Sequence, residues 1–342
     1  MSDAIFSIPL PVNEPVLNYA PGSPERAALK AALADLKSKR VEIPMFIGGK
    51  HVHSQHQVAI HPPHELSHTL GHFSKGNAGY VKEAVAAALA AKPAWEAMPW
   101  QDRAAIFLKA ADLLAGPFRA RMNAATMLCQ SKNPFQAEID CVCELVDFWR
   151  FNAWFMQEIY KNQPLISPRG TWNRTDWRPL EGFIFALTPF NFTSIAGNLP
   201  TAPAMLGNVA VWKPAESQVY SAAVIMEILE AAGLPPGVIN LVYVDGPVIG
   251  DVVFNHPDFA GLHFTGSTGG FQRLWKTIGE NIHKYKTYPR IVGETGGKDF
   301  VMVHASADPK AVAVALSRGA FEFQGQKCSA ASRAYIPKSL WK

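Results

Sequence analysis

The spacing of apolar residues divides the chain into a helical first half and an alternating second half. Between 77 and 160, apolar residues recur every three or four positions, which is typical of helices that turn one face toward a core. This pattern predicts helices at 78–95, 101–116 and 136–160. A further helix is predicted to begin after Ser23 and to run to about Lys39, because serine is a good cap and Pro24 suits the first turn.

In the second half, short apolar runs alternate with helical stretches. The runs lie at 182–188, 209–213, 238–244 and 261–265, and the helical stretches at 194–207, 217–233 and 248–256. This β-α-β rhythm predicts an α/β fold with a Rossmann-type parallel sheet and helices on both faces. Sheets of this kind bind ligands beyond the carboxyl ends of their strands, so the residues that end each run are candidate site residues.

Two segments depart from these patterns. Residues 1–22 are rich in proline and are expected to form an extended arm on the body. Residues 163–178 carry Pro, Gly and Asn between β-like ends, which predicts a protruding β-hairpin. The expected units are an N-terminal arm and helix (1–44), a nucleotide-binding domain (45–162 and 181–290), an oligomerisation hairpin (163–180) and the first part of an α/β catalytic domain (291–342).

Composition describes an ordinary globular protein of roughly two domains. The 342 residues are 48% hydrophobic and 18% charged, with a net charge of +4. The basic residues are scattered, so neither nucleic acid nor a membrane surface is expected as a partner. The first basic residue is Arg26, which argues against a secretory signal and a mitochondrial presequence. We expect a cytoplasmic protein, with the mitochondrial matrix as the alternative.

Cysteine and histidine usage indicates neither disulfides nor a metal site. Four cysteines fit no disulfide framework, so a reducing compartment is the simpler interpretation. Seven histidines lie between His51 and His72, but their spacing matches no familiar metal-binding pattern. No metal is expected.

Polar residues at the strand ends are candidates for nucleotide binding. Lys213 and Glu216 end the second run and could hold ribose hydroxyls. Gly266 and Ser267 end the fourth run and open a helix, where backbone N–H groups and the helix dipole favour a pyrophosphate. Gly250 resembles part of the G-x-G-x-x-G dinucleotide-binding fingerprint, but the full motif is absent. Asn191, after the first run, could donate to an oxyanion or simply satisfy a turn.

The stretch from 290 to 333 holds two groups that could perform covalent chemistry on a carbonyl. Glu294 lies in a glycine-rich turn, and Cys328 lies among small residues that leave its sulfur accessible. A thiolate is a strong nucleophile, and the neighbouring Lys327 would favour that form. Taken singly, such a cysteine is more often a buried hydrophobe and such a glutamate is usually solvated.

Five motifs in this order resemble the aldehyde dehydrogenase superfamily. They are TPFNF (188–192), WKPAE (212–216), FTGST (264–268), GETGGK (293–298) and GQKCS (325–329). The resemblance extends over nearly the whole chain from about Met45. The closer likeness is to the branch that oxidises L-glutamate γ-semialdehyde, which has Phe where many relatives have Trp at position 190.

The resemblance implies a role for each candidate residue. Cys328 is the implied nucleophile, Glu294 the general base and Asn191 the oxyanion donor, together with the backbone N–H of Cys328. NAD is the implied cofactor, with its ribose on Lys213 and Glu216 and its pyrophosphate on Ser267. The implied substrate residues are Glu144, Phe192, Lys327 and Ser329. The implied reaction is the NAD-dependent oxidation of L-glutamate γ-semialdehyde to L-glutamate in proline breakdown, by a homodimer or higher oligomer.

Alternatives remain open on the sequence alone. A CoA-acylating aldehyde dehydrogenase, a Cys-Glu-Lys amidase that uses Lys298, and an inactive NAD-binding remnant all retain some of these residues. Glu216 would repel the 2′-phosphate of NADP, which favours NAD. Members of the superfamily continue well beyond the nucleophile, so we expect this chain to be a C-terminally truncated piece.

Overall fold

A mixed seven-stranded sheet forms the centre of the molecule in the computed structural model, which describes residues 6–341. The strand order is β10-β9-β6-β7-β8-β2-β3. Their bounds are β2 (Met45–Ile47), β3 (Lys50–Val52), β6 (Phe183–Leu187), β7 (Val209–Lys213), β8 (Ile239–Leu241), β9 (Phe259–Thr265) and β10 (Arg290–Glu294). The run from β10 to β8 is parallel, as predicted, whereas β2 pairs antiparallel with both β8 and β3.

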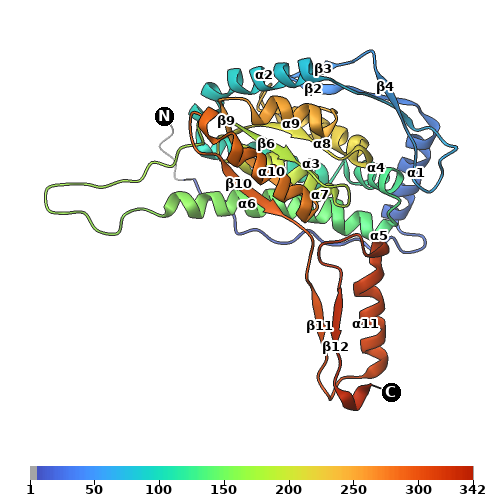
Figure 1. The fold of residues 1–342 in the computed structure, drawn as a ribbon. Coiled ribbons are helices and arrows are strands. Elements are labelled where there is room, and N and C mark those ends of the chain that lie inside the picture. Colours follow the sequence, from blue (N-terminus) through green and yellow to red (C-terminus); the bar gives the residue numbers. More distant parts are fainter. Residues whose placement is uncertain (1–5, 342) are drawn as a thin grey trace.

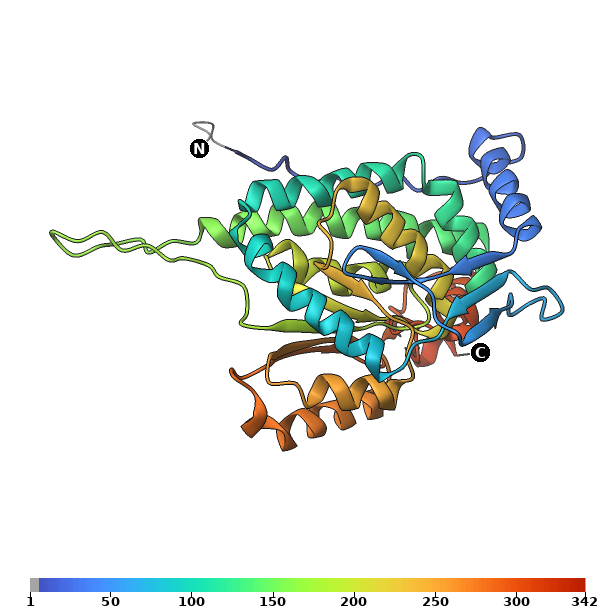
Figure 2. The same cartoon turned by 90° about the horizontal axis from the view of Figure 1, so that it is seen from above.

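Helices cover both faces of this sheet. One layer contains α3 (Trp100–Ala115), α4 (Arg119–Gln130), α6 (Glu144–Lys161), α7 (Thr193–Met205) and α8 (Val219–Ala232). The other contains α2 (Ala78–Ala97), α9 (Gly246–Phe254) and α10 (Thr268–Glu280). Figure 2 shows α9 and α10 on the opposite side of the sheet from α3, α6 and α7. Strands β6 and β7 are buried along nearly their whole length, which explains their continuous apolar sequence.

The histidine-rich region forms a smaller sheet of β1 (Val41–Ile43), β5 (Gly71–Ser74) and β4 (Gln57–Ile60). It follows α1 (Pro24–Ser38), where the Ser23 side chain accepts a hydrogen bond from the Arg26 N–H as the sequence predicts. Among residues 6–341, no cluster of His, Cys, Asp and Glu is placed to hold a metal ion.

The helix expected at 136–160 is interrupted. It consists of α5 (Pro134–Ala137), a π-helical segment η1 (Glu138–Cys143) and α6. The π-helical segment buries two carboxylates, Glu138 and Asp140, which pair with Arg119 and Lys132. Such pairing offsets the cost of burying a charge. Because Arg119 and Lys132 lie outside the predicted helix, the apolar pattern of 136–160 could not reveal the π-helical segment.

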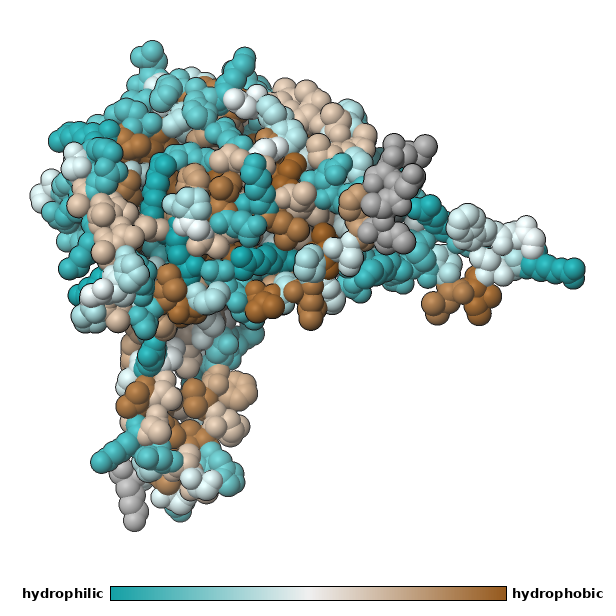
Figure 3. All heavy atoms as spheres, turned by 180° about the vertical axis from the view of Figure 1, so that it is seen from behind, coloured by the Kyte–Doolittle hydropathy of each residue, from teal (hydrophilic) through white to brown (hydrophobic). Residues whose placement is uncertain are grey.

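The last residues form a β-α-β unit that projects from the body (Figure 1). Strands β11 (Phe300–Met302) and β12 (Arg333–Tyr335) are parallel and are connected through α11 (Pro309–Phe321), which buries no residue. Short 3-10 turns complete the described chain: η2 (Glu216–Gln218), η3 (Ile282–Lys284), η4 (Glu322–Gly325) and η5 (Lys338–Leu340). Figure 3 shows hydrophobic residues gathered on this projection, and they include Phe300, Met302 and Phe321.

The segment 163–178 protrudes as predicted but is not a β-hairpin. It extends far from the body (Figures 1 and 2), and none of its residues is in a strand. Two hydrogen bonds between Gln163 and Thr175 close its base. Pro164 and Pro168 lack the N–H groups that a ladder needs, so the prediction of paired strands was wrong.

Along residues 6–341, no helix has the length and apolar character needed to cross a membrane.

Candidate active site

A cleft of about 770 Å³ opens at the carboxyl ends of β6, β7 and β9, where the topology predicts a ligand. Its walls come from the loops that follow these strands and from one side of α9 and of α10 along most of their length. The cleft contains Thr188, Phe190, Lys213, Gly250, Gly266, Ser267 and Arg273.

The α10 side of the cleft presents the start of a helix. Ser267 is the cap of α10, and its hydroxyl accepts a hydrogen bond from the Gly270 N–H at 3.1 Å. A Cβ on Gly266 would lie 2.6 Å from the Phe264 ring, so the close approach at this position requires glycine. Backbone N–H groups at such a helix start suit an anion, which matches the predicted place of a pyrophosphate.

Lys213 lines the cleft, whereas Glu216 is not among its lining residues. The Lys213 ammonium is largely buried, burial lowers its pKa, and Pro214 O at 3.1 Å is its one hydrogen-bond acceptor within residues 6–341. The Glu216 side chain is 68% exposed, and its Oε1 lies 3.8 Å from Lys75 Nζ. Lys75 also contacts Asp245 at 2.7 Å, and this hydrogen bond raises the pKa of Lys75. The motif reasoning did not identify Lys75 and Asp245.

Three loops meet around Cys328. Asn191, in the loop after β6, donates from Nδ2 to Gln326 O at 2.8 Å, which uses one of the two N–H groups of its amide. A Cβ on Gly297 would lie 1.4 Å from Cys328 O, so the loop after β10 lies directly against the loop that contains Cys328. Cys328 itself is half-buried in a turn closed by the Ala330 N–H and Lys327 O.

Glu294 is the last residue of β10, three positions before Gly297. Its side chain is exposed, and Thr265 Oγ1 lies 3.4 Å from its Oε2. The structure thus places Glu294 at the mouth of the cleft. Within residues 6–341, no hydrogen bond joins the side chains of Glu294 and Cys328.

A second cavity of about 450 Å³ contains the four predicted substrate residues. They are Glu144, Phe192, Lys327 and Ser329. Because Lys327 and Ser329 flank Cys328, this cavity adjoins the loop that contains Cys328. It also contains Asn13, Glu14 and Val16 from the N-terminal arm, Asp140 and Asp147 from the body, and Glu322 from the C-terminal projection.

Two of these side chains are tightly held. Glu144 begins α6, accepts a hydrogen bond from the Ser194 hydroxyl and has its pKa raised by burial. Lys327 Nζ lies 2.9 Å from Asp140 and 3.3 Å from Glu322. Asp140 and Glu322 compensate the charge of Lys327. These contacts do not support the expectation that Lys327 stabilises a thiolate at Cys328.

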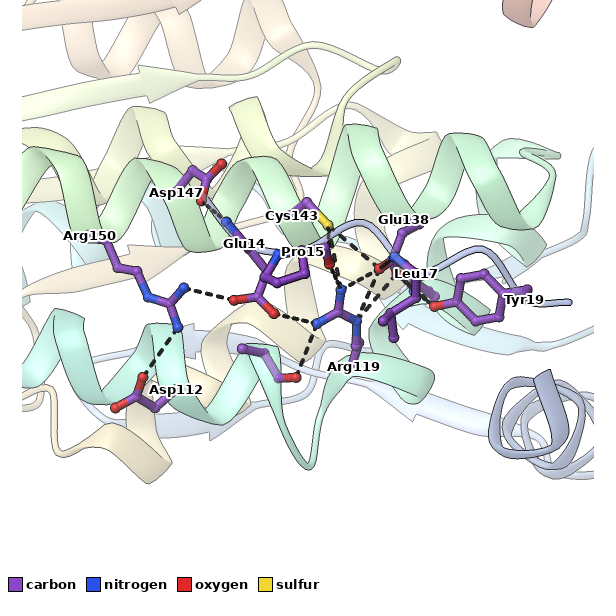
Figure 4. Close-up of polar contacts among 12 residues, drawn as sticks. Glu14, Pro15, Leu17, Tyr19, Asp112, Arg119, Glu138, Cys143, Asp147 and Arg150 are labelled. Atoms are coloured by element: carbon purple, nitrogen blue, oxygen red, sulfur yellow. Dashed lines mark hydrogen bonds and ion pairs between the residues drawn. The ribbon is translucent and has the colours of Figure 1, made fainter. Parts of the chain in front are cut away.

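The N-terminal arm forms one wall of this second cavity. Figure 4 shows the polar contacts that hold the arm, among them those of Glu14 and Tyr19. Asp147 accepts hydrogen bonds from the Asn13 amide and the Glu14 N–H, both at 2.7 Å. Arg119 binds Glu14 and the fully buried Glu138. The sequence predicts an arm lying on the body, but its proline-rich composition carries no signal for these partners.

Known proteins resemble this chain over nearly its whole length. The Aldehyde dehydrogenase family profile matches residues 51–342. A Delta-1-pyrroline-5-carboxylate dehydrogenase of Agaricus bisporus is 52% identical over 99% of this chain and 62% of its own length. The mitochondrial enzyme of that name from Mus musculus is 46% identical over 96% of this chain and 58% of its own length.

Solved structures show the same architecture. The Delta-pyrroline-5-carboxylate dehydrogenase from Mycobacterium tuberculosis bound with NAD is 55% identical, with a TM-score of 0.96 over 99% of this chain and 64% of that chain. A Thermus 1-pyrroline-5-carboxylate dehydrogenase with bound NAD is 29% identical, with a TM-score of 0.91 over 98% of this chain and 65% of that chain. The chain spans about 60% of the length of the curated relatives it matches. On its sequence and its fold, this chain belongs to the aldehyde dehydrogenase family.

Proposed function

We propose that this chain carries the nucleophile, the general base and the nucleotide cleft of an NAD-dependent L-glutamate γ-semialdehyde dehydrogenase, an enzyme of proline breakdown. The observation that carries the proposal is the position of Cys328. It lies between the loops of Asn191 and Glu294 and beside the cavity that contains Glu144, Phe192 and Lys327. The relatives named Delta-1-pyrroline-5-carboxylate dehydrogenase support this substrate.

The cleft fits a dinucleotide. Lys213 is a buried ammonium with one carbonyl acceptor, so it can donate to ribose hydroxyls, and the first turn of α10 offers N–H groups to a pyrophosphate. When bound, NAD supplies the acceptor for the hydride that leaves the substrate carbon. We propose NAD over NADP because the Glu216 carboxylate, three residues after Lys213, would repel a 2′-phosphate. Two relatives were solved with NAD bound.

The remaining chemistry belongs to the side chains of this chain. The Cys328 thiolate adds to the aldehyde carbon and forms a C–S bond, while the carbonyl oxygen takes up the negative charge. The second N–H of the Asn191 amide and the backbone N–H of Cys328 are the proposed donors to that oxygen. As that oxygen re-forms the carbonyl, the C–H bond breaks, and the hydride, which bound NAD would accept, leaves the carbon as a thioester. Glu294 then removes a proton from water, the resulting hydroxide attacks the thioester, and the C–S bond breaks to release the acid and the thiolate.

Replacing the nucleophile tests this assignment. We expect Cys328→Ser to abolish aldehyde-dependent NADH formation, because a hydroxyl at this position is a much weaker nucleophile than a thiolate. Cys129→Ala removes a buried thiol outside the site and is the matched control, expected to keep the reaction. NADH formation by Cys328→Ser at the wild-type rate would refute the proposal. Amide hydrolysis without any need for NAD would instead favour the amidase alternative.

Replacing the buried lysine of the cleft tests the cofactor assignment. We expect Lys213→Met to raise the KM for NAD about tenfold or more, the loss expected for a hydrogen bond from a charged donor. The control is Lys82→Met, which removes an exposed lysine from α2. The steady-state KM for NAD is measured for both variants and for the wild type. An unchanged KM for NAD in Lys213→Met would contradict the assignment.

Assembly and location are also part of the proposal. The protruding segment 163–178 exposes Leu165, Ile166 and Trp172, which suits burial against a second copy in a homodimer or higher oligomer. The cytoplasm is the proposed location, and the mitochondrial matrix is the alternative that the name of the mouse relative supports.

A further inference from the structure

A buried lysine outside the predicted site lies behind the nucleophile loop. Lys132 is in the short link between α4 and α5, and none of its side chain is exposed. Its ammonium lies 2.7 Å from Asp140 in the π-helical segment η1. Burial lowers the pKa of Lys132, and the Asp140 charge partly offsets this effect. Burying an ammonium is costly unless it is paired, and an apolar side chain would fill the same space without that cost. A lysine at this position therefore suggests a role for its charge.

The same ammonium contacts two aromatic faces. Lys132 Nζ lies 4.6 Å from the centre of the Phe192 ring and 4.7 Å from the centre of the Phe323 ring. Both distances are within the range of a cation–π interaction. Phe192 belongs to the body and lines the second cavity, whereas Phe323 belongs to the C-terminal projection. Lys132 therefore joins two parts of the molecule at one point.

Phe323 lies in a strained segment. Phe323 and Gln324 have positive φ values of 49° and 55°, and Gly325 has 69°. Consecutive left-handed residues other than glycine persist only where the surroundings hold them. We call residues 323–325 the elbow. Phe323 is buried, although most of the C-terminal projection is exposed, so its ring is what anchors the elbow to the body.

The elbow leads directly to the nucleophile. Cys328 follows it by three residues, and the intervening Gln326 and Lys327 are themselves held, by Asn191 and by Asp140. Asp140 thus binds both Lys132 behind the elbow and Lys327 beside Cys328. Movement of the elbow would change the position of the sulfur.

We propose that Lys132 is a positioning residue for Cys328: its ammonium, held by Asp140, binds the rings of Phe192 and Phe323 and so fixes the elbow that sets the nucleophile. This inference rests on the proposed role of Cys328. Methionine would fill the same space without a charge, so Lys132→Met separates the cation from the volume, and Lys132→Arg restores the cation.

Alkylation of Cys328 by iodoacetamide, followed by mass spectrometry, tests the inference without any need for turnover. In Lys132→Met we expect Cys328 to be alkylated at least about threefold faster, because the elbow is released locally. The buried Cys129, Cys141 and Cys143 should remain unlabelled. Lys132→Arg and the control Lys92→Met, which changes another largely covered lysine, should stay within about twofold of the wild type. An unchanged Cys328 rate in Lys132→Met, or equal labelling of all four thiols, would overturn the inference.

Turnover gives a second, separable result. We expect Lys132→Met to lower kcat about tenfold or more while the Kd for NAD is unchanged, since displacement of a nucleophile by about 1 Å can cost more than that. Phe323→Leu should lower kcat similarly, and the double variant should be little worse than either single variant. Additive losses in the double variant would show that Lys132 does not act through Phe323. If the wild-type protein oxidises no aldehyde, the proposed function fails, and the alkylation rates still decide the role of Lys132.

Discussion

At the scale of single residues, burial separates the candidate nucleophile from the other thiols. Burial raises the pKa of Cys129, Cys141 and Cys143 to about 12, so these three are protonated and inert near neutral pH. Cys328 is half-buried in a turn that adjoins the second cavity. Only this cysteine combines accessibility with neighbours that could bind a carbonyl oxygen, which is the physical basis for assigning it the covalent step.

Glu144 gives a pH-dependent prediction at the same scale. Burial raises its folded-state pKa above the usual 4.5, so its contribution to stability is fully present below pH 4.5 and is lost as the pH rises through the folded-state pKa. Glu144→Gln removes the buried charge but keeps a group that can accept from Ser194. At pH 8 we expect the variant to melt about 2 to 4 °C higher than the wild type, the shift that about 1 kcal/mol produces in a domain of this size.

The matched measurement is a set of melting curves from pH 4 to pH 8. The difference between Glu144→Gln and the wild type should shrink toward pH 4, where the wild-type carboxyl is protonated. A variant that is less stable than the wild type at pH 8 would show that the Glu144 charge is net stabilising, contrary to this account.

At the scale of elements, the π-helical segment η1 lines the second cavity and holds its neighbouring segments in place. Its Glu138 holds the N-terminal arm, through Arg119, Tyr19 and the Leu17 N–H, and its Asp140 holds Lys132 and Lys327. Burial would raise the pKa of Glu138, but the hydrogen bonds from Arg119 and Tyr19 outweigh it and lower the pKa. One turn of irregular helix thus fixes both a wall of the cavity and the loop that carries the nucleophile.

The contact between the arm and the body predicts that replacing Arg119 lowers the free energy of unfolding much more than replacing its neighbour Arg121. Arg119→Met leaves the fully buried Glu138 without its cationic partner, and we expect it to lower the free energy of unfolding by about 3 to 5 kcal/mol. Arg121→Met removes an exposed pair with Glu227 and should cost less than about 1 kcal/mol. Urea unfolding of both variants makes the comparison. Equal losses would contradict the view that the arm is anchored through a buried ion pair.

The sequence predicts regular elements better than irregular ones. The parallel strands β6, β7 and β9 were predictable because they are buried along nearly their whole length, which produces continuous apolar runs such as 183–187. The antiparallel β2 and β3 have only three residues each, too few for a periodic signal. The π-helical segment was missed because Glu138 and Asp140 are compensated by Arg119 and Lys132, which no local pattern reveals.

At the scale of the whole molecule, two cavities lie against the loops that meet around Cys328. The nucleotide-type cleft lies at the carboxyl ends of β6, β7 and β9, and the second cavity lies between the N-terminal arm, α6 and the nucleophile loop. The resemblance to the aldehyde dehydrogenase superfamily implied that the residues of these two sites belong together. It could not predict the arm as a wall, or Lys132 behind the elbow, because those contacts depend on chain segments that pack together from distant parts of the sequence.

The central claim is that Cys328 forms a thioester that Glu294 helps to hydrolyse, and the pre-steady-state behaviour of Glu294→Gln tests it most directly. Rapid mixing with NAD and L-glutamate γ-semialdehyde should release a burst of about one NADH per site, followed by little turnover, with the acyl group on Cys328 detectable by mass spectrometry. Steady-state turnover by Glu294→Gln at the wild-type rate, with no acyl group on Cys328, would contradict the account.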